Sequence, residues 1–273
     1  RSRARSALPP RTAERRSWSW TPIWYGPRVS AGGIRARVRA ELTKEIADVA
    51  RRHLAESGAA GLSLRAVARE LGMASSAVYR YFPSRDDLLT ALIVDAYDAI
   101  GAAAEAADRE AGPDLRERWR AVCFAVRGWA LAHPHEWALV YGSPVPGYSA
   151  PRTTVQPAAR LPMVIIGIIR DGLAAGSITD PAEGTDEVLH PALVEDVGLP
   201  IGPATSLGSR GVLVWSSLIG TITFEVFGQL TNVVQDRDRY FEVTIDRLGA
   251  LVGITELRRA RPRGRSPRPP APP

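Results

Sequence analysis

The stretch Leu62–Arg85, LSLRAVARELGMASSAVYRYFPSR, decides the fold of this chain. Its first half places apolar residues at the i, i+3, i+4 and i+7 positions of one helix face: Leu64, Val67, Ala68 and Leu71. Ser63 is a preferred residue for capping the start of that helix. Gly72 ends the helix, because a residue without Cβ takes the left-handed conformation of a C-cap at little cost.

After a turn of about three residues, the pattern predicts a second short helix from about Ser75 to Phe82. Pro83 would close this helix, and Ser84 can cap the next one. The second helix would bury one set of side chains, Ala77, Val78 and Phe82. Its opposite face would present Ser75, Ser76, Tyr79 and Arg80. Two short helices that offer small polar, aromatic and basic groups outward are suited to reading DNA.

Three segments carry a family resemblance. They are Ser-Leu-Arg-x-Val-Ala-x-x-Leu-Gly at 63–72, Ala-Val-Tyr-Arg-Tyr-Phe at 77–82 and Ser-Arg-Asp-Asp-Leu-Leu at 84–89. With this dense signature the chain resembles the TetR family of bacterial one-component transcriptional regulators. The resemblance implies an all-α fold, in which a three-helix N-terminal helix-turn-helix domain precedes a larger antiparallel helical domain for ligand binding and dimerisation.

The expected DNA contacts fall into two groups. In the major groove, base contacts are predicted for Ser75, Ser76, Tyr79 and Arg80. Phosphate contacts, which position the protein without reading sequence, are predicted for Ser63, Arg65, Tyr81 and Arg85.

The formal net charge of +6 combines three blocks of different sign. Residues 1–40 hold ten Arg and one Glu, residues 41–256 hold 19 basic and 28 acidic residues, and residues 257–273 hold six Arg and no acid. Within the acidic middle block, Leu62–Arg85 is a basic island of four Arg against one Glu. This asymmetry would orient the approach of the protein to a polyanion such as DNA.

Composition and pattern divide the chain into four expected segments. These are a disordered basic extension at 1–33, a helix-turn-helix DNA-binding domain at 34–84 (the reading head), a helical effector-binding and dimerisation domain at 85–256 (the body) and a disordered Arg/Pro-rich tail at 257–273.

The extension at 1–33 admits three interpretations: a basic arm that lies along DNA, an export signal led by Arg15-Arg16, or a stretch upstream of the native start. The apolar part of a signal would be too short and too polar. We favour the third interpretation, because the chain opens without Met.

Helical spacing recurs through the rest of the chain, and no strand or hairpin signal appears. A first helix carries Leu42, Ile46, Val49, His53 and Leu54 on one face and stops at Ser57-Gly58. In the body, helices are expected from Ser84 and at 115–132, 135–142, 157–175, 206–231 and 237–253, with a short one near 185–197. By the resemblance, the helix that begins at Ser84 couples effector binding to the separation of two reading heads.

The last two expected helices are apolar on more than one side, which exceeds the need of a single-chain core. The resemblance implies that two such helices from each subunit form a four-helix bundle in a homodimer. The interface is predicted at Trp215, Ile219, Ile222, Phe227, Phe241, Ile245 and Leu248. The alternative is a helical hairpin wholly buried inside one subunit.

An effector cavity between the body helices is also implied by the resemblance. Its predicted lining is Trp119, Cys123, Trp137, Tyr141, Met163, Ile166, Arg170 and Trp215. The stretch at 129–142, WALAHPHEWALVYG, resembles a segment of the TetR subgroup with a Trp-His-Gly type C-terminal domain.

Other classes of function lack their motifs. No phosphate-binding loop, zinc-binding His pair or nucleophile elbow appears, so the sequence predicts neither an enzyme nor a cofactor. His133 and His135 have no third ligand at metal spacing, and no metal is expected. The uncharged, apolar run 211–224 is shorter than the roughly 20 residues of a membrane span. We expect a cytoplasmic protein without an intrachain disulfide, since Cys123 is the only cysteine.

The sequence therefore predicts a sequence-specific DNA-binding transcriptional regulator. The expected activity is that of a homodimeric repressor, released from a palindromic operator in double-stranded DNA by a small, partly apolar effector. Two alternatives stay open: a DNA-binding protein without a small effector, and a small-molecule binding protein with a vestigial helix-turn-helix.

Overall fold

A computed structural model describes residues 31–180, 186–189 and 205–255. The chain divides into two compact units, residues 1–42 and 43–273. In the first unit the described residues are the start of helix α1 (Ala31–Gly61), whose side chains are exposed from Arg35 to Glu41. The tail and nearly all of the predicted extension lie outside the described residues, and Ala31–Gly33 belong to α1.

The second unit holds the rest of the reading head, formed by the remainder of α1, α2 (Leu64–Glu70) and α3 (Ser75–Val78). Gly58 interrupts α1 with a φ of 68°, so the predicted stop at Ser57-Gly58 is confirmed. Together with the start of α4 (Arg85–Glu110), these helices enclose a small apolar core. Its most buried members include Ile46, Val49, Ala50, Val67, Ala68, Val78, Leu88 and Leu89.

Helix α3 is shorter than the sequence predicts. It ends at Val78, and the amides of Arg80 and Tyr81 bond three residues back, at 3.2 and 2.9 Å, instead of four. Pro83 then prevents the helix from continuing, because a proline has no amide hydrogen to donate. The predicted burial of Val78 and Phe82 is confirmed, whereas Ala77 is half-buried.

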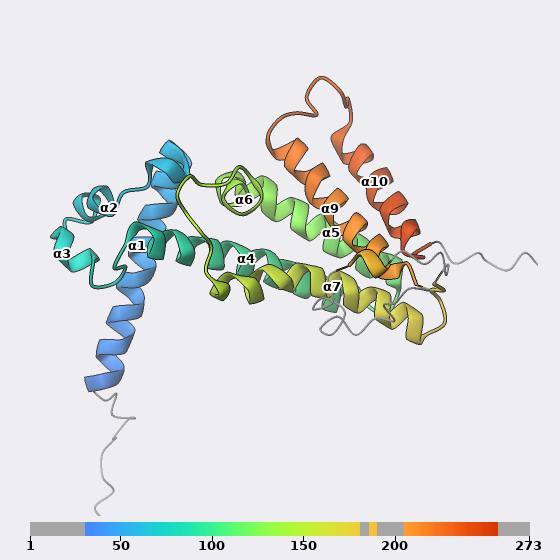
Figure 1. The fold of residues 1–273 in the computed structure, drawn as a ribbon, viewed down its shortest axis with the longest axis horizontal. Coiled ribbons are helices and arrows are strands. Elements are labelled where there is room, and N and C mark those ends of the chain that lie inside the picture. The colour runs from blue at the N-terminus through green and yellow to red at the C-terminus, as the bar shows by residue number, and fades with distance from the viewer. Residues whose placement is uncertain (1–30, 181–185, 190–204, 256–273) are drawn as a thin grey trace, which may run out of the picture. The chain divides into compact units, whose positions relative to one another are not determined.

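The body contains α4, α5 (Leu115–Ala132), α6 (Pro134–Tyr141), α7 (Val155–Ala174), α9 (Leu207–Val226) and α10 (Arg237–Leu251), with 3-10 turns at Arg152–Thr154 (η1) and Asp186–Val188 (η2). Helix α4 packs along α5 and α7, and α9 pairs with α10 (Figure 1). No strand occurs among the described residues, so the all-α prediction is confirmed. None of the helices in the described ranges has the length and hydropathy of a membrane span.

Most helix bounds in the body agree with those predicted from the sequence to within two residues, but α9 ends five residues earlier than predicted. Gly228, with a φ of 73°, follows its C-cap. The amides of Gly228 and Gln229 then bond back to Glu225 and Phe224, which satisfies the last carbonyls of the helix. The short helix expected near 185–197 falls mostly outside the described residues, and only the turn η2 is seen.

Candidate DNA-binding site

The turn between α2 and α3 is fixed by backbone hydrogen bonds. The Ser63 hydroxyl accepts the Ala66 amide at 3.5 Å at the start of α2. At its end Gly72 has a φ of 64°. The Gly72 amide bonds to the Arg69 carbonyl at 3.2 Å, and the Met73 amide bonds to the Ala68 carbonyl at 2.9 Å. These two bonds form a Schellman cap, which sets the direction in which the chain enters α3.

The four residues predicted to contact bases lie on one outward surface. The side chains of Ser75, Ser76, Tyr79 and Arg80 are all exposed. Val78, on the underside of the same turn, is fully buried in the head core. The short helix therefore has one anchored side, and its other side is open for a duplex.

The residues predicted to contact phosphates differ in their surroundings. Arg65 is exposed on α2 and forms no ion pair with any residue in the described ranges, while Ser63 and Tyr81 are half-buried. The Arg85 guanidinium donates to the carbonyl oxygens of Ala59 at 2.7 Å and Leu62 at 3.2 Å. Arg85 thus ties the end of α1 to the start of α4, a role that the sequence pattern did not indicate.

A polar contact also holds α2 against α1. The Glu70 carboxylate accepts a hydrogen bond from Arg52 at 2.7 Å and lies 2.6 Å from His53 Nε2. The hydrogen bond from Arg52, followed by that from His53, lowers the pKa of Glu70. His53 is therefore a hydrogen-bonded structural residue.

The eight predicted effector-pocket residues do not lie on one wall. Trp119, Cys123 and Trp137 are fully buried, and Tyr141, Ile166 and Trp215 pack against the same body core. Met163 and Arg170 are exposed on α7 and stand apart from this cluster. Helical spacing indicates that a residue is apolar and inward, but it does not separate a packed core from a cavity lining.

Two of these core residues are tied down by hydrogen bonds. The Trp119 indole donates to the Ile245 carbonyl at 2.7 Å, and the Trp137 indole donates to Thr223 Oγ1 at 3.1 Å. Burial raises the pKa of the Cys123 thiol, which behaves as a core residue. The Nε1 of Trp215, in contrast, is buried and has no hydrogen-bond partner among the described residues.

The predicted dimer interface needs correction. Ile222, Phe241, Ile245 and Leu248 are at most 8% exposed and belong to the core of their own subunit. Trp215 and Ile219 are half-buried, and Phe227 is exposed. The apolar residues that α9 leaves uncovered are Val212, Leu213, Phe224 and Phe227, at 39 to 52% exposure. Helix α9 is apolar on two sides, as the sequence indicates, but Ile222 of the predicted set lies on the side that faces the core of its own subunit, and Phe227 lies on the exposed side.

Two family models match the chain across this architecture. The model described as bacterial regulatory proteins, tetR family, matches residues 46–92. The model described as Tetracyclin repressor-like, C-terminal domain, matches residues 119–248, which contain the stretch at 129–142. With the outward-facing α3, these matches define a DNA-binding transcriptional regulator with a helix-turn-helix head.

Relatives of known sequence give the same result. The HTH-type transcriptional regulator Rv1816 of Mycobacterium tuberculosis (strain ATCC 25618 / H37Rv) is 41% identical over 208 residues, 72% of this chain and 86% of the relative. The regulator Mb1846 of Mycobacterium bovis (strain ATCC BAA-935 / AF2122/97) shows the same identity and coverage. The chain belongs to the TetR family, and the names of its relatives indicate a transcriptional regulator and not an enzyme.

Solved structures share the fold. The regulatory protein SCO4313 is 35% identical, with a TM-score of 0.64 over 78% of this chain and 97% of that one. A protein of unknown function from Rhodococcus sp. RHA1 is 26% identical, with a TM-score of 0.59 over 76% of this chain and 93% of that one. The likeness therefore extends over both the reading head and the body.

Proposed function

We propose that this regulator is a homodimeric repressor that binds a palindromic operator and leaves it when a small, partly apolar effector binds in the body. The observation that carries the DNA-reading part is the exposed surface of Ser75, Ser76, Tyr79 and Arg80, opposite the buried Val78. A surface of this size and polarity on a capped, short helix fits the major groove.

Base recognition would rest mainly on Arg80, because a guanidinium can pair with both acceptors of a guanine edge. Ser75 and Ser76 can serve several bases, and Tyr79 adds a ring and a hydroxyl. Arg65, Ser63 and Tyr81 would contact phosphates and fix the register. Arg85 would contribute to DNA binding partly by holding the reading head in shape, because its guanidinium donates to the carbonyl oxygens of Ala59 and Leu62.

Dimerisation would use the outer face of α9. Leu213, Phe224 and Phe227 are exposed apolar residues at helical spacing on this face. Exposed large apolar side chains that share one helix face are typical of a protein interface. Two reading heads related by a twofold axis would meet two half-sites about one helical turn apart, so the operator would be palindromic.

The effector would bind near Trp215. A buried donor without an acceptor costs roughly 1 to 3 kcal/mol, and Trp215 Nε1 has no acceptor in the part of the chain that the structure describes. An apolar molecule with one acceptor group would satisfy this atom from within the body core. Its binding would favour a head spacing that no longer matches the operator, to the extent that it prefers that state.

The DNA-reading role is tested by selecting genomic fragments bound by the full chain and measuring their affinity by fluorescence anisotropy. Arg80→Ala should cost roughly 1 to 3 kcal/mol and relax selectivity at one base position. Arg65→Ala should weaken all sequences alike and lower the salt slope by about one. Arg109→Ala, which removes the same charge from the exposed end of α4, is the control. If Arg80→Ala and Arg109→Ala behave alike, α3 is not the reading element.

The dimer is tested by sedimentation at micromolar concentration. Leu213→Glu should convert the protein to a monomer, because it places a charge within the proposed apolar interface. Val155→Glu is the matched control, since Val155 is 63% exposed at the start of α7. A Leu213→Glu variant that sediments as the parent protein does would exclude this face.

A further inference from the structure

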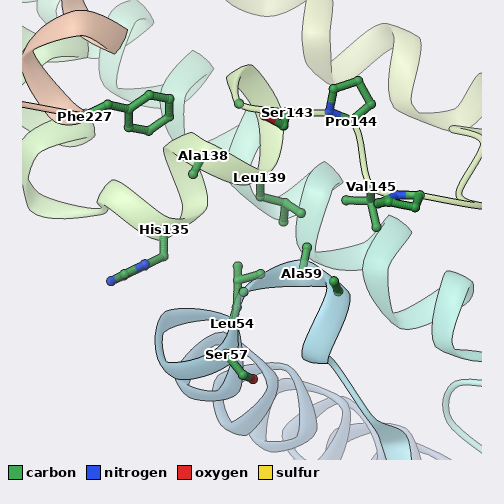
Figure 2. A pocket seen from close by; sticks show the side chains of 14 residues that line it. Leu54, Ser57, Ala59, His135, Ala138, Leu139, Ser143, Pro144, Val145 and Phe227 are labelled. Atoms are coloured by element: carbon green, nitrogen blue, oxygen red, sulfur yellow. The ribbon is translucent and has the colours of Figure 1, made fainter. Parts of the chain in front are cut away.

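A pocket of about 390 Å³ lies between the end of α1 and helix α6. Figure 2 shows Leu54 and Ala59 on the α1 side, Ala138 and Leu139 on the α6 side, and Val145 in the loop that follows α6. Phe227, the C-cap residue of α9, completes the lining. None of these residues belongs to the set predicted for the effector cavity.

We propose that this junction pocket is a second ligand site of the regulator, for an uncharged and mainly apolar small molecule. Its volume lies near the lower end of the roughly 300 to 1,000 Å³ of small-molecule sites. Its 14 lining residues include no Lys, Arg, Asp or Glu. A charged ligand would lose its hydration there without gaining an ion pair, so the charge pattern selects a neutral one.

Hydrogen bonding in the pocket is sparse and placed at its edge. The polar side chains of the lining are Ser57, Ser143 and His135, and His135 is exposed. The Ser57 hydroxyl already donates to the His53 carbonyl at 2.8 Å. One or two polar groups on the ligand would therefore suffice, and its contact with Leu54, Leu139 and Phe227 would supply most of the affinity.

Small residues create the space. Ala59, Ala60 and Ala138 project only a methyl group toward the pocket region, and glycines end both bordering helices. Gly58 has a φ of 68°, which a residue with a Cβ rarely adopts. At Gly142 a Cβ would lie 2.3 Å from the Ala138 carbonyl oxygen. Two of the lining residues, Gly58 and Gly142, are therefore required by the local backbone.

The walls of the pocket belong to elements with different tasks. Leu54–Ala60 end the first helix of the reading head, α6 belongs to the body, and Phe227 ends the helix proposed to dimerise. Arg51 of α1 links the reading head to the body. Its Nη2 lies 2.6 Å from Asp95 on α4, and its Nε lies 3.2 Å from Glu136 on α6. An occupant that separates α1 from α6 would strain this bridge, so occupancy would bear directly on the position of the reading head.

The test uses the full chain and N-phenyl-1-naphthylamine, a neutral apolar fluorescent probe. Binding is followed by fluorescence, and its location by hydrogen exchange with and without probe. We expect one saturable site, with slower exchange in peptides covering 54–60 and 135–146 and unchanged exchange in α5 and α7. Protection confined to α5, α7 and α9 would place the probe in the body core and overturn the proposal, as would the absence of binding.

Two variants make the assignment specific. Ala138→Phe should fill the pocket and weaken probe binding roughly tenfold or more, whereas Ala132→Phe, at an exposed position outside the lining, should leave it unchanged. If Ala138→Phe fails to fold, Ala60→Phe replaces it, with the exposed Ala55 as the matched control position. Equal probe affinity in the filled and control variants overturns the proposal. Operator binding by the unliganded chain is measured separately, so a failure of this site is distinguishable from a failure of the DNA-reading role.

Discussion

The reading head and the body use polar side chains in different ways. In the head, the pair of Arg52 with Glu70 is at the surface, and both side chains are more than 40% exposed. In the body, Arg127 and Glu225 are at most 9% exposed and form a bidentate pair at 2.6 and 2.8 Å. The Arg127 guanidinium also lies 4.9 Å from the centre of the Phe241 ring.

This difference follows from what each region must do. A surface that meets DNA has to keep its polar groups available, so the head obtains its order from helix caps and a small apolar core. The body is free to bury charged groups, provided that each finds a partner. We therefore expect substitutions of polar residues to destabilise the body far more than the head.

The largest effect is expected for Glu225→Gln. Among the described residues it leaves Arg127 with a single charged partner, Asp238, whose carboxylate lies 2.7 Å away but is itself 85% exposed. The unfolding free energy should fall by about 3 kcal/mol, since removal of one member of a buried ion pair costs roughly 3 to 5 kcal/mol of stability. Urea unfolding followed by circular dichroism at fixed protein concentration measures it.

The matched variant in the head is Arg52→Ala, which breaks the exposed pair with Glu70. Exposed ion pairs contribute little, because water and salt screen them and ordering long side chains costs entropy. Its effect on unfolding should be several-fold smaller than that of Glu225→Gln. Equal losses in the two variants would show that the two regions are stabilised alike.

A second and smaller effect concerns the N-terminus of α9, where Asp186 is 1% exposed. Its carboxylate accepts the amides of Gly208 at 3.1 Å and Ser209 at 2.8 Å, and the Thr205 hydroxyl at 2.7 Å. Asp186→Ala should lower the unfolding free energy at pH 7 by roughly 1.5 to 3 kcal/mol, because these donors lose a charged acceptor.

The same site makes a prediction about pH. Burial alone would raise the pKa of Asp186, but the hydrogen bonds from Ser209, Thr205 and Gly208 outweigh it, and the pKa is lowered. Because the pKa is lower in the folded state, the ionised carboxylate stabilises the fold at pH values above the unfolded pKa, near 3.8. This stabilisation is lost as the pH falls through the folded-state pKa. The difference between parent and Asp186→Ala should therefore shrink below about pH 4. A difference that stays constant down to pH 2.5 would contradict this account.

The sequence predicted local features well, and long-range pairings poorly. Asp114, Ser84 and Gly72 lie where capping rules place them, so the ends of their helices could be predicted. Arg127 and Glu225 are 98 positions apart, and only the packing of α5 against α9 brings them together.

The candidate site shows the same division. The outward residues of α3 could be predicted from helical periodicity, because the apolar Val78 identifies the buried side of the helix. The faces of α9 could not be separated in this way, since Ile222 and Phe224 are equally apolar but only Phe224 is exposed. The contact of Arg85 with the Ala59 carbonyl depends on where α1 ends, which no local pattern at Arg85 records.

Small effects of opposite sign are expected for glycine substitutions in the two regions. Gly72→Ala should destabilise the head by roughly 1 to 2 kcal/mol, because its φ of 64° places a Cβ against the following carbonyl. Gly128→Ala should stabilise the body by roughly 0.5 to 1 kcal/mol, because Gly128 is helical and exposed and its Cβ would meet nothing within 4 Å. Thermal unfolding of the two variants, with hydrogen exchange to locate the change, measures both. If Gly72→Ala left the exchange of α2 and α3 unaltered, the glycine cap would not be what holds the reading helix in place.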